Sequence, residues 1–546
     1  MDTQRSALLI VFMFSLFMLW DGWQRQSQPP AAQAPAAAAA QSPGAQAPVP
    51  TVSPAAGAAD VPPVAVATQK AAVRVETDLF IADVSAEGGS LIRLELLKHR
   101  AGPESTGNFV LLDNGAQHLY HAQSGLIGQG LPTHKTVYQL PAGGELKLAD
   151  GQDSVELRMT APGPEGVTVT KVLVFHRGSY SIDTRYEIAN ASGAPVNAHA
   201  YFQVLRDGQK ISAGTSMLST FTGPAFYTEE GKYQKVEFAD IDKEKAKYVT
   251  KAPDGWVAMV QHYFVSAFIP APGIEREFFA RKVANDLYTA GVVVPVPSAA
   301  PGATSTISVP LYTGPQIQAN LVALAPGLDR VVDYGWLKII ASPMHWVLEK
   351  LHALVGNWGW AIILLTVLIK AIFFPLSAAS YRSMAKLRLV TPRMQQIKER
   401  HANDRARMQQ EMMELYKTEK INPLGGCLPI VIQIPVFISL YWVLLGSVEM
   451  RNAPWIGWIT DLSIKDPFFV LPLLMGVTMF VQTKLNPTPP DPIQAKVMLF
   501  LPVVFTGMFL FFPSGLVLYW TINNILSIAQ QWQITRMIEA GKTAKA

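Results

Sequence analysis

The 546-residue sequence contains a single cysteine, Cys427, which excludes an intramolecular disulfide. It also lacks CxxC and HExxH motifs, a P-loop and a nucleotide-binding fingerprint in a suitable context, so we expect no cofactor, no metal site and no enzymatic activity. Charged residues make up only 16% of the chain and the net charge is +4, which does not point to a nucleic-acid partner. This composition argues against a soluble enzyme and favours a large soluble part joined to a membrane part.

The N-terminal segment, residues 1–23, carries Arg5 followed by an apolar run that ends near Trp20. A cleaved signal peptide and a retained transmembrane anchor both fit this pattern. The sequence Trp-Asp-Gly-Trp that closes the run is not a small-residue cleavage site, which favours the retained anchor. Residues 24–71 are rich in Ala and Pro and almost free of charge, so we predict a disordered linker that is exported with the domain after it.

Residues 72–328 are predicted to form a large antiparallel β-sandwich in the exported part of the chain. Apolar residues alternate in Val167–Phe175 and Tyr180–Ile188, and glycine-containing turns punctuate the strands. Carboxylates and histidines fall at positions that we assign to strand faces. Such pairs could serve a glycosidase, but solvated strand faces look the same and we favour a structural role. The residues concerned are Asp183, Glu187, His176 and His262.

The remainder of the chain is predicted to hold five further transmembrane helices, TM2 to TM6. Their ranges are 353–376, 424–446, 467–483, 497–512 and 515–534. The segments between them are an amphipathic interfacial helix at 329–352 that Pro343 interrupts, a cytoplasmic helical hairpin at 377–422, a cytoplasmic loop at 484–496 and a basic cytoplasmic tail at 535–546. An alternative places the 329–352 helix on the sandwich. With the anchor, this topology puts both termini in the cytoplasm.

The hairpin carries ten Lys and Arg residues against five acids, which indicates a cytoplasmic position. Apolar residues recur at helical spacing on both sides of a turn near Asp404. The methionines among them would form either an adaptable surface for apolar partners or the seam of the hairpin itself, and we favour the seam. The residues are Met384, Leu387, Met394, Ile397, Met408, Met412 and Leu415.

Lys370 lies inside the apolar span from Trp358 to Leu376. A cation at that depth costs about 2.5–3.5 kcal/mol on insertion scales. It would either snorkel to the near interface or line a water-filled cavity, with Thr366 on the same helical face. Other spans carry neutral polar residues, which are either helix–helix contacts or further cavity lining: Gln433, Gln482, Thr521, Asn523 and Asn524. Since no acid lies within the spans, a transient acidic partner of Lys370 is favoured.

Two motifs, Asn422–Pro429 (NPLGGCLP) and Phe512–Tyr519 (FPSGLVLY), together with the lysine-bearing span, closely resemble the YidC family. This family comprises bacterial membrane protein insertases and is related to the mitochondrial and thylakoid insertases. The resemblance covers residues 337–532, and the preceding anchor, linker and β-domain are similar to the Gram-negative form. It implies a protein of the bacterial inner membrane that inserts, folds and helps to assemble integral membrane proteins, alone or with the Sec translocon.

The resemblance also implies a hydrophilic groove within the membrane, with a cationic residue that attracts the polar part of a substrate. The family residue is usually arginine, and here Lys370 stands at that position, which keeps the charge but loses the fork geometry. Thr366, Tyr519 and Trp520 match substrate-contacting positions, and we add Gln433, Asn523 and Asn524 to the predicted groove. The implied partners are nascent membrane proteins, membrane lipids and the Sec machinery including SecD–SecF. Ribosome binding is expected to be weak because the tail is short.

A secondary transporter or a channel with an extracytoplasmic β-sandwich binding domain is the alternative function. A transporter of this kind commonly shows internal repeats and more spans. We find no repeat in the sequence, and five core spans are few. The residue pattern therefore favours the insertase.

Overall fold

The computed structural model describes residues 71–102, 105–116, 118–209, 220–401, 404–419, 428–486 and 492–543. The predicted anchor at 1–23, almost all of the 24–71 linker, Cys427 and most of the NPLGGCLP motif lie outside the described residues. The description that follows is limited to the ranges above.

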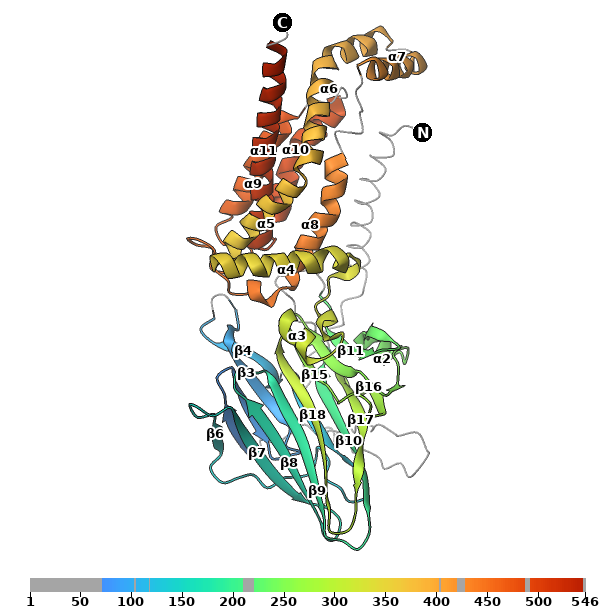
Figure 1. The fold of residues 1–546 in the computed structure, drawn as a ribbon, viewed down its shortest axis with the longest axis vertical. Coiled ribbons are helices and arrows are strands. Elements are labelled where there is room, and N and C mark those ends of the chain that lie inside the picture. Colours follow the sequence, from blue (N-terminus) through green and yellow to red (C-terminus); the bar gives the residue numbers. More distant parts are fainter. Residues whose placement is uncertain are drawn as a thin grey trace, which may run out of the picture. The chain divides into compact units, whose positions relative to one another are not determined.

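Two large sheets form the first half of the described chain (Figure 1). The ten-stranded sheet has the order β13-β16-β17-β10-β5-β4-β3-β2-β1-β6, and the eight-stranded sheet has the order β12-β11-β14-β15-β18-β9-β8-β7. The strands are β1 (Ala72–Glu76), β2 (Phe80–Ser85), β3 (Leu91–Arg100), β4 (Asn108–Asn114), β5 (Leu119–Ile127), β6 (Glu145–Lys147), β7 (Ser154–Pro162), β8 (Val167–His176), β9 (Ser181–Asn190), β10 (Val196–Asp207), β11 (Gly223–Thr228), β12 (Lys232–Lys235), β13 (Lys251–Ala252), β14 (Trp256–Gln261), β15 (Phe264–Phe268), β16 (Arg276–Ala284), β17 (Leu287–Ala299) and β18 (Thr304–Pro315).

The strands predicted at 167–175 and 180–188 correspond to β8 and β9, which pair antiparallel. In β9 every second side chain is buried, because one face of the strand covers the core and the other does not. One short pair departs from the antiparallel expectation: β1 and β6 run parallel. The turn between β8 and β9 contains Gly178 with a φ of +67°, a conformation that glycine adopts without a Cβ penalty.

Apolar side chains from both sheets share one core. The Tyr186 ring of β9 lies 6.3 Å from that of Phe202 in β10, and the Tyr186 hydroxyl shares a 2.9 Å hydrogen bond with Ser124 of β5. Each fully buried aromatic side chain of this kind stabilises the fold by about 1.5–3 kcal/mol. A disulfide-free sandwich of this size is therefore stabilised by its own core.

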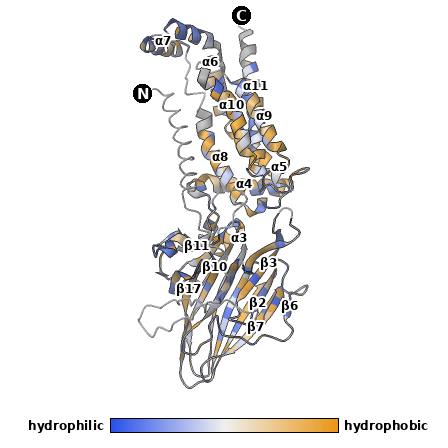
Figure 2. Cartoon of the chain, turned by 180° about the vertical axis from the view of Figure 1, so that it is seen from behind, coloured by the Kyte–Doolittle hydropathy of each residue, from blue (hydrophilic) through white to orange (hydrophobic). Residues whose placement is uncertain are grey.

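The second half of the described chain is helical. The helices are α2 (Phe238–Asp242) and α3 (Gln318–Leu324) beside the sheets, then α4 (Lys338–Val355), α5 (Trp358–Ile372), α6 (Phe374–Arg400), α7 (Arg405–Thr418), α8 (Leu428–Gly446), α9 (Val470–Leu485), α10 (Pro492–Phe509) and α11 (Ser514–Thr543), with 3-10 turns η1 (Leu328–Val331), η2 (Gly335–Leu337) and η4 (Val448–Met450). Figure 2 shows that apolar residues dominate α9 and α10.

The predicted interruption at Pro343 is wrong, since α4 runs through this proline. Proline removes the hydrogen bond to the carbonyl four residues earlier, that of Ile339. Ile339 is 83% exposed and lies in the first turn, so the cost of the unpaired carbonyl is low there. The segment before Lys338 forms 3-10 turns instead of the start of the predicted 329–352 helix.

Other helix boundaries also differ from the sequence prediction. The helix predicted to run to residue 376 ends at Ile372, and α6 begins at Phe374 with a proline in its first turn, where a missing N–H is tolerated. At the other end of the chain, α10 starts at Pro492 within the predicted 484–496 loop. Helix α11 continues to Thr543 through most of the predicted 535–546 tail.

No single helix of the described ranges is both long and apolar enough to cross a membrane. Trp358–Ile372 and Phe374–Met384 reach that length and hydropathy only as a pair, with a bend of 65° between them. Shorter apolar helical stretches are Ile432–Gly446, Val470–Leu485 and Ala495–Phe509.

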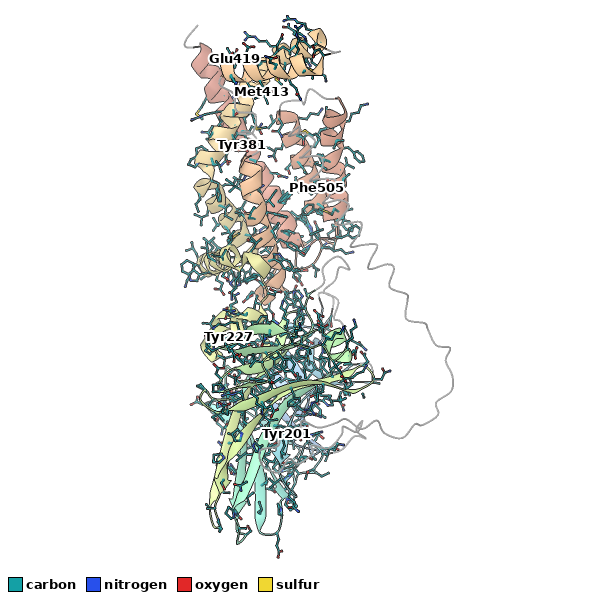
Figure 3. The ribbon with its side chains drawn as sticks, turned by 90° about the vertical axis from the view of Figure 1, so that its right-hand side faces the viewer. Tyr201, Tyr227, Tyr381, Met413, Glu419 and Phe505 are labelled. Carbon is teal, nitrogen blue, oxygen red and sulfur yellow. The ribbon has the colours of Figure 1, made fainter. Side chains whose placement is uncertain are left out.

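Helices α6 and α7 form the predicted hairpin. The Asp404 side chain caps α7 by accepting a hydrogen bond from the Arg407 backbone N–H at 3.0 Å. Met394 is buried in a small cluster that Met412 also joins, which supports the seam interpretation for these two methionines. Met413 instead is 57% exposed on α7 (Figure 3).

Candidate functional site

Lys370 lies in the last turn of α5, at the contact between α5 and α11. Its side chain is buried, with 4% exposed, and its Nζ donates a hydrogen bond to Ser527 Oγ at 2.8 Å. The Ser527 hydroxyl in turn donates to the backbone carbonyl of Asn523 at 2.7 Å. The ammonium is therefore held between two helices by a neutral acceptor.

Thr366 lies one turn before Lys370 and is 1% exposed. Its hydroxyl donates to the Ile362 carbonyl at 2.7 Å, within its own helix. Among the ion pairs between described residues, none involves Lys370. The lysine thus occupies a buried position without an acidic partner in the described part of the chain.

Four buried polar residues follow one face of α11, and we call them the α11 polar stripe: Thr521, Asn524, Ser527 and Gln531. Their spacing of three or four residues places them on one side of the helix. Asn524 Nδ2 donates to Thr478 Oγ1 of α9 at 3.3 Å, and Gln531 Nε2 donates to the Leu485 carbonyl at 3.0 Å. The stripe therefore faces α9 as well as α5.

Tyr381 of α6, labelled in Figure 3, also reaches this region, because its hydroxyl interacts with that of Ser527. Ser527 thereby contacts groups from α5 and α6 while it remains bonded to its own helix. Sequence reasoning missed both Ser527 and Tyr381. The spacing of the α11 polar stripe within a charge-free run was the signal that could have identified Ser527.

Tyr519 and Trp520 lie in a different environment, an aromatic cluster with α8 and α10. The Trp520 ring is 4.3 Å from that of Phe437 and 5.8 Å from that of Phe509. Tyr519 is buried and stacks on Phe437 at 6.2 Å. Trp520 Nε1 is buried without a hydrogen-bond partner among the described residues.

The structure thus brings together only part of the predicted groove. Lys370 and Thr366 share a face of α5, Asn523 joins them through its backbone, and Asn524 belongs to the α11 polar stripe. Gln433 is half-buried in α8, and no hydrogen bond between described residues links it to Lys370.

Three of the sandwich residues that the sequence singled out, His176, Asp183 and Glu187, form pairs on the eight-stranded sheet. His176 Nε2 and Asp183 Oδ2 are 2.9 Å apart, and Arg158 pairs bidentately with Glu187. The expectation that His262 lies on a strand face is wrong, because it occupies the two-residue turn between β14 and β15. Such pairs are typical of the solvated face of a strand.

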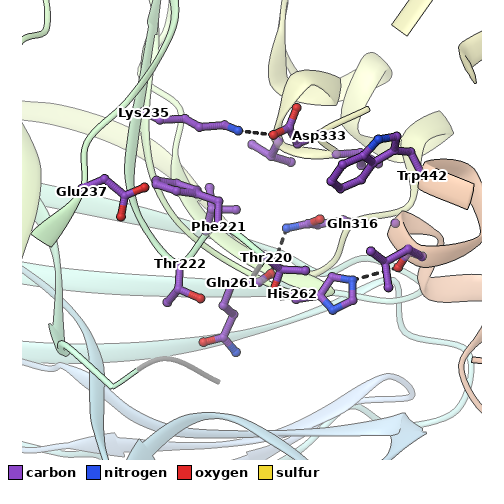
Figure 4. Close-up of a pocket in the computed structure, with 15 residues that line it drawn as sticks. Thr220, Phe221, Thr222, Lys235, Glu237, Gln261, His262, Gln316, Asp333 and Trp442 are labelled. Atoms are coloured by element: carbon purple, nitrogen blue, oxygen red, sulfur yellow. Dashed lines mark hydrogen bonds and ion pairs between the residues drawn. The ribbon is translucent and has the colours of Figure 1, made fainter. Parts of the chain in front are cut away.

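A cavity of about 260 Å³ opens beside this turn (Figure 4). His262 Nε2 donates a 2.8 Å hydrogen bond to the Leu445 carbonyl, and burial lowers the pKa of the imidazole to about 4. The amide of Gln261 and the hydroxyl of Thr222 are buried there without partners among the described residues. Lys235 and Asp333 form an ion pair at the rim.

Comparisons with known proteins decide the family. Residues 72–347 match the family described as the YidC periplasmic domain, and residues 350–542 match the family described as the 60Kd inner membrane protein. A relative from Aromatoleum aromaticum named membrane protein insertase YidC is 60% identical over 550 residues, covering 100% of this chain and 99% of the relative. The chain belongs to the YidC family.

A second YidC relative, from Dechloromonas aromatica, is 56% identical over 549 residues. The match covers 100% of this chain and 99% of the relative. The match with a crystal structure of an active YidC insertase, with its first transmembrane domain resolved, covers 85% of this chain and 92% of that chain. The sequence identity is 18% and the TM-score is 0.39. The resemblance found in the sequence and the predicted fold class, a β-sandwich followed by a helical membrane part, are confirmed. The protein is a membrane protein of the YidC family.

Proposed function

We propose that the protein inserts segments of other polypeptides into the membrane, and that Lys370 attracts the polar or acidic part of the substrate. Membership of the YidC insertase family supports the general function. The observation that carries the role of Lys370 is its burial against Ser527 with no ion pair to any described residue. A substrate carboxylate would supply the missing partner.

The energetics favour a transient partner over a permanent one. A buried cation bears a desolvation cost of several kcal/mol unless it is paired. A substrate acid that approaches Lys370 recovers part of this cost, and the cost returns when the acid moves on, so neither partner is trapped. The membrane potential adds about 2.3 kcal/mol per charge per 100 mV and drives acids toward a positive exterior. Insertion then requires no nucleotide.

The remaining residues have proposed roles around this centre. The α11 polar stripe, with Thr366, Gln433 and Asn523, would offer hydrogen-bond partners to a polar segment during transfer. Tyr519 and Trp520 would contact apolar parts of the substrate. We retain the six-span arrangement with both termini in the cytoplasm and a periplasmic β-domain as part of the proposal, since the positive charge of the α6–α7 hairpin supports a cytoplasmic position.

The proposed substrates are nascent integral membrane proteins, and the hairpin is the proposed receiving element. Further proposed partners are membrane lipids and the Sec translocon with SecD–SecF, with at most weak ribosome contact. No enzymatic activity and no cofactor enter this mechanism. The location we propose is a bacterial inner membrane.

The test is insertion of a single-span substrate into nucleotide-free proteoliposomes that contain the purified full-length protein. The substrate carries one acid in its translocated tail, and a second version carries an amide there. We expect Lys370→Ala to slow insertion of the acidic substrate at least about tenfold, a difference of 1.4 kcal/mol in the barrier, while Lys370→Arg retains most of the activity. Lys496, exposed on α10, provides the matched control Lys496→Ala.

Equal rates for the wild type and Lys370→Ala on both substrates would refute the proposed role of the lysine. A similar loss of insertion with Lys496→Ala would attribute the effect of Lys370→Ala to the general charge of the protein and would also refute the specific role of Lys370. If even the wild type inserts nothing, insertion by the protein alone is refuted, and ion or solute flux through the same liposomes then tests the transporter alternative.

A further inference from the structure

A second cluster of chemically reactive groups lies apart from Lys370, on α4 and the short turn η4 after α8. His345 and Glu349 stand four residues apart on α4 and therefore share one helix face. Glu449 belongs to η4. The imidazole nitrogen and the two carboxylate oxygens all lie within 4.8 Å of one another, and His345 Nδ1 is 3.8 Å from Glu349 Oε1.

The histidine of this cluster is buried, both glutamates are half-buried, and positive charge is scarce around them. His345 is 2% exposed, and no ion pair between described residues joins Glu449 to a lysine or an arginine. Lys350 is the cation that acts electrostatically on Glu349. It is exposed, however, and its ammonium lies over the Trp346 ring, 5.8 Å from the ring centroid. Two carboxylates so close together repel each other unless a proton or a cation neutralises them.

A buried hydroxyl provides an independent observation. Tyr334 is 1% exposed, and its hydroxyl has no hydrogen-bond partner among the described residues. The Tyr334 ring packs beside the cluster, with its centroid 6.2 Å from that of the His345 imidazole. The neighbouring Ser447 hydroxyl donates to the Val443 carbonyl at 2.6 Å. A buried polar group of this kind calls for an explanation such as a bound ion or water.

The pKa shifts of the three side chains are compatible with a metal ion bound to the imidazole nitrogen. Burial lowers the pKa of His345 to about 4, so the imidazole is neutral and its lone pair is free at physiological pH. Burial raises the pKa of Glu449 to about 7 and also raises the pKa of Glu349. A divalent cation would compensate the two carboxylates together.

We propose that His345, Glu349 and Glu449 bind one divalent transition-metal ion of the Zn²⁺ type. One imidazole and two carboxylates form a donor set typical of such ions, whereas Mg²⁺ and Ca²⁺ prefer oxygen ligands alone. Ligand bonds of about 2.0–2.2 Å in tetrahedral geometry require donor atoms about 3.3 Å apart. The present separations need to close by roughly 0.5–1.5 Å, a change that glutamate rotamers can supply. Water, bonded to Tyr334, would take the fourth position.

The metal would tie α4 to the segment between α8 and α9. Glu349 and Glu449 are far apart in the sequence, so a bound ion closes a long loop and stabilises the folded chain by mass action. This site is separate from Lys370 and goes beyond the proposed function. Insertion activity is therefore no part of its test.

The experiment uses tag-free full-length protein that has been stripped with EDTA and then titrated with Zn²⁺ or with Co²⁺. We expect one equivalent to bind, the thermal unfolding midpoint to rise, and Co²⁺ to give the visible absorption bands of a low-coordinate site. His345→Gln and Glu449→Gln should each weaken binding at least about tenfold. Glu411→Gln is the matched control, because Glu411 forms another His–Glu pair with His401 at 2.9 Å but without a third ligand.

Folding of the variants is checked without metal. Glu449→Gln removes one of two like charges, so its metal-free unfolding midpoint should equal or exceed that of the wild type. Stoichiometric binding that survives in Glu449→Gln, or that is lost in Glu411→Gln instead, would overturn the assignment. Absence of Zn²⁺ and Co²⁺ binding in the wild type would overturn it as well and leave a shared proton as the neutralising charge.

Discussion

The hydrogen bond between Lys370 and Ser527 predicts an energetic coupling that a double-mutant cycle can measure. Ser527→Ala removes the only acceptor that the described residues offer to the buried ammonium. A hydrogen bond to a charged group contributes about 1.5–3 kcal/mol in soluble proteins, whereas interhelical hydrogen bonds in membranes average about 0.6 kcal/mol. We expect a coupling at the lower end of the first range, about 1.5 kcal/mol.

The cycle pairs Ser527→Ala with Lys370→Met, which keeps the length of the side chain but removes the charge. In the methionine background Ser527→Ala should cost less than about 0.6 kcal/mol, since only neutral contacts of Ser527, with the Asn523 carbonyl and with Tyr381, are lost. Lys370→Met alone should leave the protein as stable as the wild type or more stable, because the relieved desolvation of about 2.5–3.5 kcal/mol exceeds the lost bond. Such a variant would be stable but impaired in insertion.

Reversible unfolding in mixed detergent micelles, followed by circular dichroism, gives the four free energies. Ser439→Ala is the matched control, as Ser439 is fully buried in α8 and donates only to the Pro435 carbonyl of its own helix. Its cost should be the same with and without Lys370→Met. An equal cost of Ser527→Ala in both backgrounds, or a marked destabilisation by Lys370→Met, would refute the view that the lysine is a strained and weakly satisfied cation.

Three further predictions concern packing, pH and surface charge. Gly476→Ala should destabilise the helical part by about 1–3 kcal/mol in the same unfolding assay, because the added Cβ would lie 2.1 Å from Thr506 Oγ1, whereas Gly507→Ala meets no atom within 4 Å and should be neutral. Burial lowers the pKa of His121 to about 4, so its stability contribution is present above pH 6.5 and lost as the pH falls toward 4. Other buried histidines add to the acid loss, so thermal melts should show that His121→Asn reduces the wild-type loss between pH 7.5 and 5 by up to about 2 kcal/mol. Glu187→Gln should change stability by less than about 1 kcal/mol and leave insertion unaltered, since its pairs are solvent-exposed; a larger effect on insertion would reopen a functional role for this face.

Local sequence patterns predicted the helices and strands, whereas contacts between residues distant in the sequence could not be predicted. The alternation at 167–175 identified a strand because the two faces of a sheet differ in burial over a few residues. The same logic identified Lys370, whose charge stands out in an apolar run. Ser527 did not stand out, because serine is unremarkable in a helix until its partner is known. The His345–Glu349 pair likewise gained meaning only when the fold brought Glu449 beside it.

The break after Ile372 alters the interpretation of Lys370 itself. A straight helix through residue 376 would place the lysine in its interior, but the chain bends by 65° and Lys370 falls in the last turn of α5. The unpaired carbonyls at a helix C-terminus favour a cation by about 0.3–1 kcal/mol, and the Ser527 bond adds about 1.5 kcal/mol. Together these terms offset most of the 2.5–3.5 kcal/mol insertion cost without a carboxylate. The geometry thus keeps the cation inside the protein and leaves its charge available, a combination that a permanent ion pair would abolish.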